Sequence, residues 1–249
     1  MLSKSQISFI KSLHQKKYRK AHGLFLVEGL KSIKEYINSK YQIDSIYYVS
    51  EQSALLPKLP ANINLFEVNN ADLGKISTLQ MPQGFLALIK TPETKKLAPS
   101  TLANRFTLVL DGVQDPGNMG TIIRTADWFG FENIICSEDS VEAYNPKTVQ
   151  ATMGSLPRIN IYYENLNIFF EQNTLPVFGA LLDGKSIYET NWGNEGIIVL
   201  GNEGKGISAE VIAQVNQPVT IPRVGGAESL NVAVSAAIFC AEIVRVKNF

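Results

Sequence analysis

Short apolar runs alternate with amphipathic segments along the second half of the chain, as in the runs 106–110 and 197–200. Continuous apolar runs are typical of strands buried on both faces, and apolar positions one helical turn apart are typical of helices. The predicted strands are 106–110, 133–136, 158–162, 177–181, 197–200 and 219–221. The predicted helices are 120–129, 146–152, 165–171, 208–215 and 230–247. This alternation predicts an α/β fold with a mostly parallel sheet and helices on both faces.

The first part of the chain alternates in the same way over shorter distances. The predicted strands there are 25–27, 43–49, 64–68 and 85–89, and the predicted helices are 3–17, 30–38 and 71–78. This pattern predicts a separate small α/β domain. The segment Thr91 to Arg105 has Thr, Pro and Lys with little periodic apolar content, which is typical of a linker. We therefore expect two domains, at 1–97 and 98–249.

Composition narrows the class of protein. The 249 residues are 45% hydrophobic, which is enough to build real cores. No apolar run has the length of a membrane-spanning helix and no signal-peptide pattern opens the chain, so we expect a cytoplasmic protein without a membrane partner. Cys136 and Cys240 lie in apolar contexts and are expected to be buried thiols. His14 and His22 stand in no ligand motif, and we therefore expect no metal.

The formal net charge of zero hides an asymmetry between the two halves. Residues 1–97 hold 14 Lys and Arg against 7 Asp and Glu, which leaves 9 and 16 of the totals of 23 and 23 for residues 98–249. A basic half of this kind indicates contact with nucleic acid, although a solvated helix face is the simpler alternative. The candidate RNA-binding residues crowd one short segment: Lys11, Lys16, Lys17, Arg19 and Lys20.

Three polar, glycine-containing stretches occur in the second half of the chain. They are 115–126 (DPGNMGTIIRTA), 200–204 (LGNEG) and 228–232 (ESLNV). The first two come directly after predicted strands and the third opens the predicted last helix. Because the carboxyl ends of parallel strands meet at one edge of a sheet, these stretches predict a single site built from strand ends.

Together the three stretches resemble the signature of the SpoU (TrmH-like) RNA ribose methyltransferases, a branch of the SPOUT superfamily. The resemblance covers the second domain closely and the first more loosely. It implies a deep trefoil knot, which the pattern alone would not propose because knots are rare. It also implies S-adenosylmethionine as cofactor, an RNA ribose 2′-hydroxyl as methyl acceptor, and a homodimer formed through the second domain. The first domain resembles a ribosomal-protein RNA-binding fold, which favours ribosomal RNA over transfer RNA.

The same resemblance implies the site residues. The implied catalytic set is Asn118, Arg124, Glu203, Ser229 and Asn231. The implied cofactor-binding set, which acts through main-chain groups, is Ala180, Gly201, Ile221 and Leu230. From the residues alone, Asn118 is equally well a turn residue, and Ser229 or Glu228 equally well the cap of the last helix. Glu203 either tethers its loop or faces the substrate.

Arg124 stands in an otherwise uncharged run, where an unpaired charge would be costly if it were buried. Arginine stays protonated in proteins and is a poor base, so we expect Arg124 to bind a substrate phosphate and to stabilise the developing alkoxide. The proton would leave to a phosphate oxygen or to water. A silent RNA-binding module and a nucleotide-dependent oxidoreductase are the alternatives. The dinucleotide fingerprint is missing, since Gly201, Gly204 and Gly206 have the wrong spacing.

Overall fold

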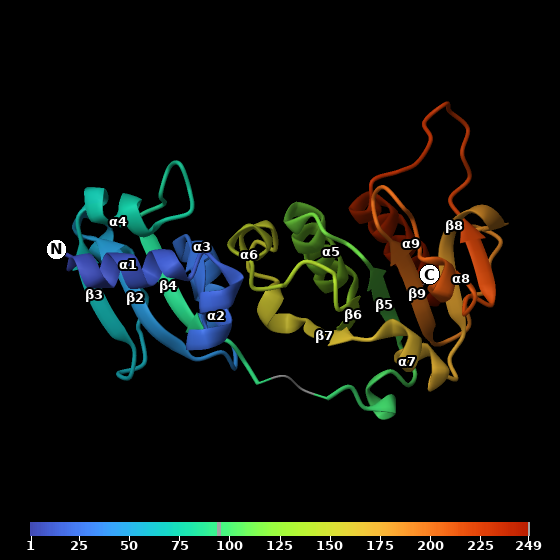
Figure 1. Cartoon of the computed structure of the whole chain (residues 1–249), viewed down its shortest axis with the longest axis horizontal. Helices are drawn as coiled ribbons and strands as arrows, with labels where there is room; N and C mark the ends of the chain where they lie inside the picture. Colours follow the sequence, from blue (N-terminus) through green and yellow to red (C-terminus); the bar gives the residue numbers. More distant parts are fainter. Residues whose placement is uncertain (94–95, 249) are drawn as a thin grey trace. The chain divides into compact units, whose positions relative to one another are not determined.

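The computed structural model describes residues 1–93 and 96–248 and divides the chain into two compact units (Figure 1). One unit is Met1–Glu93 with Glu142–Pro157, and the other is Thr94–Val141 with Arg158–Phe249. The segment Glu142–Pro157 was expected in the second domain, but it packs with the first unit. Of the predicted linker, residues 94 and 95 lie outside the described residues. No helix among the described residues is long and apolar enough to cross a membrane.

The first unit is built on a mixed four-stranded sheet with the order β1-β4-β2-β3. Strand β4 is antiparallel to β1 and β2, whereas β2 and β3 are parallel. The strands are β1 Leu24–Glu28, β2 Ile43–Val49, β3 Asn64–Val68 and β4 Phe85–Lys90. The helices are α1 Lys4–Ser12, α2 Lys16–His22, α3 Leu30–Ile37, α4 Asn70–Ile76, α6 Pro146–Ala151 and the 3₁₀ turn η1 Ser50–Leu55. The small α/β domain predicted from the pattern is confirmed.

The predicted single helix 3–17 is wrong, because the chain breaks after α1. Gln15 has an extended backbone (φ −101°, ψ 137°), and α2 begins one residue later. Ile10 and Leu13 pack into the core of the unit. The break turns the lysine-rich end of the predicted helix into a separate short helix.

The second unit contains a six-stranded sheet with the order β10-β8-β9-β5-β6-β7, in which every pairing is parallel. The strands are β5 Phe106–Asp111, β6 Asn133–Ser137, β7 Asn160–Glu164, β8 Val177–Ser186, β9 Gly196–Gly201 and β10 Gln217–Thr220. The helices are α5 Pro116–Phe129, α7 Leu166–Glu171, α8 Ala209–Ile212 and α9 Val232–Asn248. Two 3₁₀ turns, η2 Pro99–Thr101 and η3 Leu156–Arg158, complete the described secondary structure.

Both faces of this sheet are covered, as predicted. On one face Val109, Ile135 and Val199 pack with residues of α7 and α8. Neighbouring strand positions such as Leu108 and Leu110 point to the other face and are fully buried too. The strand order reverses between β5 and β9, and ligands of such sheets bind at the carboxyl ends of the strands at this reversal. The fold therefore directs attention to the ends of β5 and β9.

Candidate functional site

Asn118 lies in the first turn of α5, close to the end of β5. Asp115 caps this helix, since its Oδ1 accepts a hydrogen bond of 2.8 Å from the Asn118 backbone N–H, and Pro116 occupies the first helical position. The helix therefore begins four residues before the predicted start at 120. The alternative role of Asn118 as a turn residue with positive φ is thus wrong, because the residue is helical.

A chain of side-chain hydrogen bonds joins the three motifs. Asn118 Nδ2 donates to Glu203 Oε1 at 2.8 Å, and Asn231 Nδ2 donates to Asn118 Oδ1 at 2.9 Å. Since a carboxylate only accepts, the contact with Glu203 sets the amide orientation of Asn118. These hydrogen bonds hold side chains from three distant parts of the sequence next to one another.

Asn231 also caps α9. Its Oδ1 accepts from the backbone N–H of Ala233 at 2.9 Å and of Val234 at 3.3 Å. The helix begins at Val232, and the predicted start at 230 with a cap at Ser229 or Glu228 is wrong. Ser229 is exposed, and among the described residues no group is hydrogen-bonded to its hydroxyl. Its hydroxyl is therefore available to a ligand.

The loop after β9 is tightly folded and carries Glu203. The backbone groups of Asn202 and Gly206 exchange two hydrogen bonds of 2.9 Å, and Asn202 Nδ2 donates to the Gly112 carbonyl at 2.7 Å. A Cβ at Gly201 would lie 2.2 Å from backbone atoms of Gly206 and Ile207. Only glycine therefore fits at the end of β9 with this loop folded back on it.

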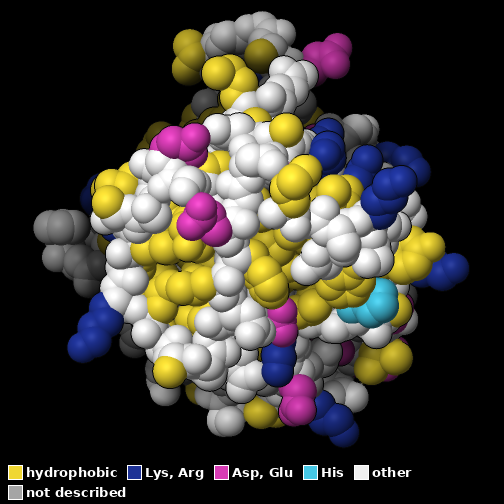
Figure 2. Space-filling model, turned by 90° about the vertical axis from the view of Figure 1, so that its left-hand side faces the viewer, with side chains coloured by type: hydrophobic (Ala, Val, Ile, Leu, Met, Phe, Trp, Pro, Cys, Tyr) yellow, Lys and Arg dark blue, Asp and Glu magenta, His cyan; other side chains and the backbone are white. Residues whose placement is uncertain are grey.

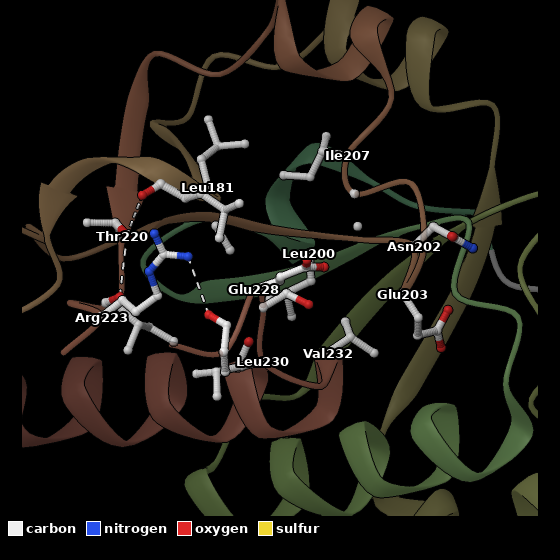
Figure 3. Close-up of a pocket in the computed structure, with 18 of the residues that line it drawn as sticks. Leu181, Leu200, Asn202, Glu203, Ile207, Thr220, Arg223, Glu228, Leu230 and Val232 are labelled. Atoms are coloured by element: carbon white, nitrogen blue, oxygen red, sulfur yellow. Dashed lines mark hydrogen bonds between the residues drawn. The ribbon is translucent and has the colours of Figure 1, made fainter. Parts of the chain in front are cut away.

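A cavity of about 560 Å³ lies beside this loop, against the middle of β8, the carboxyl end of β9 and the end of β10. In Figure 3, Asn202 and Glu203 lie at one end of the cavity and Thr220 and Arg223 at the other, while α9 borders it. All four predicted cofactor residues line the cavity, and so do two of the predicted catalytic ones: Ala180, Gly201, Ile221, Leu230, Glu203 and Ser229. Its volume is within the roughly 300 to 1,000 Å³ that is typical of small-molecule sites.

The cavity suits a ligand with an apolar body and a few polar groups. Leu181, Leu200 and Ile207 supply apolar walls, and the absence of a side chain at Gly201 lets the loop after β9 fold back beside the cavity. Among the described residues, the backbone N–H of Leu230 has no hydrogen-bond partner. These features fit S-adenosylmethionine, which has a flat heteroaromatic ring and polar groups along a flexible chain.

Among the predicted catalytic residues, Arg124 is the one that no described hydrogen bond or cavity contact joins to the others. It is exposed on α5, six residues after Asn118, and it is not among the residues that line the cavity. Within the described part of the chain its guanidinium has no hydrogen bond or ion pair. The argument that an unpaired charge in this run would be costly therefore does not apply, because water solvates the group.

Asn202 and Arg223 also line the cavity, and the sequence did not predict a role for either of them. Asn202 ties the loop after β9 to the end of β5, and its Oδ1 also accepts from the N–H groups of Gly204 and Lys205. Arg223 lies at the far end, where Nη1 donates to the Ala227 carbonyl at 3.3 Å. Asparagine beside glycine directly after a buried strand is the signal that could have identified Asn202.

The basic segment of the first unit divides into two kinds of residue. Lys11, Lys16, Lys17 and Lys20 are exposed. Arg19 is only 4% exposed and pairs with Glu142. Its Nη1 also donates to the carbonyls of Leu13 and His14, each at 2.9 Å. The prediction that Arg19 contacts RNA is wrong, because its guanidinium is buried and bonded to Glu142 and to two backbone carbonyls.

The cysteines are buried, as expected, and burial raises the pKa of both thiols. Among the described residues no group of His, Cys, Asp and Glu could hold a metal ion.

The fold and cavity together define an α/β protein with a small-molecule site at the strand ends, next to a polar network made of asparagine and glutamate. Residues 105–241 match the model of the SpoU rRNA Methylase family, and residues 4–87 match the MRM3-like substrate binding domain. The chain belongs to the SpoU methylase family and is a methyltransferase.

Relatives cover almost the whole chain. The 23S rRNA (guanosine(2553)-2′-O)-methyltransferase RlmP of Bacillus subtilis is 32% identical over 92% of this chain and 91% of its own length. A solved structure of a TrmH-family protein from Porphyromonas gingivalis has a TM-score of 0.87 at 39% identity and covers 99% of both chains. The AdoMet-bound rRNA methyltransferase of Sinorhizobium meliloti has a TM-score of 0.85 at 27% identity, over 100% of this chain and 97% of that one.

Proposed function

We propose that this chain methylates the 2′-hydroxyl of a ribose in ribosomal RNA. The enzyme class follows from the family: it is an S-adenosylmethionine-dependent RNA 2′-O-ribose methyltransferase. The ribosomal substrate is supported by RlmP, a 23S rRNA methyltransferase that aligns with both units. The observation that carries the proposal is the hydrogen-bonded series Glu203, Asn118, Asn231 beside a cavity of cofactor size.

When bound, S-adenosylmethionine supplies an electrophilic methyl group on a sulfonium centre. We assign its binding to main-chain groups of Gly201, Ile221 and Leu230, with Ala180 as a further wall. The Leu230 N–H, which has no hydrogen-bond partner among the described residues, supports this assignment. Apolar walls exclude water from the reacting centre, which favours transfer to an oxygen nucleophile over side reactions.

We assign the methyl-accepting end of the site to Asn118, Glu203, Ser229 and Asn231. Ser229 has an unused hydroxyl beside the cavity, and Glu203 holds the Asn118 amide in one orientation. These side chains would orient the ribose 2′-hydroxyl for in-line attack, and positioning of this kind supplies much of the catalysis in group transfer. Asn231 acts mainly by holding Asn118 and the start of α9.

Arg124 is proposed to bind a phosphate of the substrate and to stabilise charge that develops on the 2′ oxygen. Its guanidinium is exposed and has no partner among the described residues, which supports this role, since a planar fork of donors matches a phosphate. The proton of the hydroxyl then leaves to a phosphate oxygen or to water. The chain offers only His14 and His22 as histidines, and both belong to the first unit.

We propose residues 1–97 as the RNA substrate-binding domain and residues 98–249 as the methyltransferase domain. The exposed Lys11, Lys16, Lys17 and Lys20 would contact phosphates, while Arg19 stabilises α2 from within. The enzyme is proposed to act in the cytoplasm.

The second unit is proposed to form a trefoil knot and a homodimer. The side chains of Val234 and Val246 on α9 are each nearly half exposed, and Trp128 on the neighbouring α5 is 83% exposed. Exposed apolar side chains on two packed helices support an interface between copies. Gel filtration that gives a monomer of 27.5 kDa would contradict the dimer.

Calorimetry with S-adenosylmethionine and with NAD tests the cofactor. We expect binding of the first alone, and binding of NAD alone would favour the oxidoreductase alternative. Mass-spectrometric mapping of 2′-O-methyl groups lost from a deletion strain tests the substrate. Loss of one ribosomal site supports the proposal, loss of a tRNA site supports the transfer RNA alternative, and no loss supports a silent RNA-binding module.

A further inference from the structure

We propose that the outer surface of α1 and α2 is a stacking platform for an unpaired base of the RNA substrate. The platform is defined by the rings of Phe9, Tyr18 and His22. This inference rests on the proposed RNA substrate and adds what the first unit recognises: a single-stranded nucleotide and not only a phosphate backbone.

Three aromatic rings gather on the outside of the two helices. Phe9 and Tyr18 are each 36% exposed, and His22 is exposed as well. The rings of Phe9 and His22 meet edge to face with centroids 5.0 Å apart, and the rings of Tyr18 and His22 are parallel within 10° with centroids 6.5 Å apart. Rings with solvent-facing area in a contiguous group are suited to stacking with a base.

The buried residues of the two helices explain why these rings face outward. On α1, Ile10 packs into the core, so the adjacent Phe9 is turned away from it. On α2, Arg19 is buried by Glu142 and by two backbone carbonyls. Tyr18 and His22 are one helical turn apart on the remaining side of α2. The ion pair that removes Arg19 from RNA contact therefore also fixes the direction of the rings.

The positive charge around the platform favours a negatively charged ligand. Residues 1–27 contain six Lys and Arg side chains and no Asp or Glu, and Glu142 neutralises Arg19, which leaves five lysines. Lys17 lies over the Tyr18 ring with Nζ at 5.8 Å from the centroid, and Lys11, Lys16 and Lys20 are exposed on the same two helices. Figure 2, which looks onto one side of the first unit, shows Lys and Arg side chains near exposed hydrophobic ones, with some Asp and Glu side chains on the same face.

An apolar patch that binds another protein would not need this many uncompensated cations. Aromatic rings framed by lysines match single-stranded RNA, in which the base stacks and the neighbouring phosphates are neutralised. A fully paired duplex offers its phosphates but no free base face. The rings should therefore contribute to binding of single-stranded RNA only, and the lysines to binding of both single-stranded and duplex RNA.

The test measures binding of the full-length protein to a labelled single-stranded RNA of mixed sequence and to a blunt RNA duplex of the same length, at several salt concentrations. We expect Phe9→Ala with Tyr18→Ala to weaken single-strand affinity about tenfold or more, with the salt slope and the duplex affinity unchanged. Tyr18→Phe should retain the affinity because the ring remains. Lys16→Gln with Lys17→Gln should weaken binding to both RNAs. For the single strand the salt slope should fall by about 0.7 per lost phosphate contact.

Matched controls are Tyr188→Ala, an exposed tyrosine of the second unit, and Lys58→Gln, an exposed lysine elsewhere in the first unit. Neither should change RNA affinity. Equal single-strand affinity of the Phe9 and Tyr18 variant and the wild type would overturn the platform. A change in sedimentation of that variant without a change in RNA binding would also overturn it, because a second copy would then occupy the surface.

S-adenosylmethionine affinity, measured in parallel, should not respond to any of these substitutions, because the cavity belongs to the second unit. Circular dichroism and thermal unfolding report whether the first unit of each variant is folded. Methylation activity separates the two proposals. A chain that binds single strands through the rings but methylates no RNA would refute the proposed function and leave the platform standing.

Discussion

The substitution Asn231→Asp removes the hydrogen-bond donor to Asn118 but keeps the acceptor that caps α9. In the native protein the Asn231 oxygen caps α9 while its Nδ2 donates to Asn118. Aspartate keeps the accepting cap and adds a negative charge at a helix N-terminus, which is favourable. It loses the donor, however, so the Asn118 amide would lie between two carboxylates, Asp at 231 and Glu203.

The two substitutions at Asn231 should differ in their effects on stability and on methyl transfer. Asn231→Ala removes a cap worth about 1 kcal/mol, together with an exposed side-chain hydrogen bond worth about 1 kcal/mol or less. For a domain of this size that is a fall in Tm of about 2 to 8 °C. Asn231→Asp should change stability by no more than about 0.5 kcal/mol. Its methyl transfer should nevertheless fall about 10- to 100-fold, because the Asn118 amide can satisfy only one carboxylate and leaves its position.

The assay pairs thermal unfolding with single-turnover methylation and calorimetric titration of S-adenosylmethionine. We expect Asn231→Ala to lose both stability and rate, and Asn231→Asp to lose rate alone, with the cofactor affinity retained in the latter. Normal turnover by Asn231→Asp would refute the reasoning, because the orientation of Asn118 would then have no part in the reaction. An unchanged Tm for Asn231→Ala would refute the assignment of the cap.

Three further predictions address the cavity, the arginine and the last helix. Gly201→Ala should weaken the affinity for S-adenosylmethionine about tenfold or more, because its Cβ would meet backbone 2.2 Å away and the loop after β9 must move. Calorimetry measures this affinity, and an unchanged value would contradict a part for this loop in cofactor binding. Arg124→Lys should lower turnover about 10-fold or more without changing cofactor affinity, since lysine cannot form the bidentate contact; near-normal turnover with an unchanged pH profile would remove the proposed role. Hydrogen bonding from Arg245 holds the pKa of Glu242 below its ordinary value of 4.5, so this carboxylate stabilises the fold above that value and the contribution is lost as pH falls through the lowered pKa. Glu242→Gln should therefore be less stable than the wild type at neutral pH, with a difference in urea midpoint that shrinks in acid; a difference independent of pH would contradict the sign.

Much of the fold could be read from local patterns. The six strands of the parallel sheet were predicted within a few residues, because runs such as 106–110 and 197–200 must be buried on both faces. The ends of elements were less predictable. Helix α5 begins earlier than expected because Asp115 and Pro116 start it, and α9 begins later because Asn231 caps it. These boundaries depend on which of several polar residues makes the capping bond.

The sequence by itself determined the α/β class and the three motifs, because apolar period and glycine-bearing turns are local properties of the chain. The roles of the site residues were implied by the resemblance to the family and stay predictions. Only the tertiary structure decided how the motifs combine. The bonds from Glu203 to Asn118 and on to Asn231 join residues separated by 85 and 113 positions, and no local pattern encodes such a pairing. Arg19 shows the same limit in the first unit. Its charge predicted a solvent-facing contact, but Glu142, 123 positions away, makes burial of that charge possible.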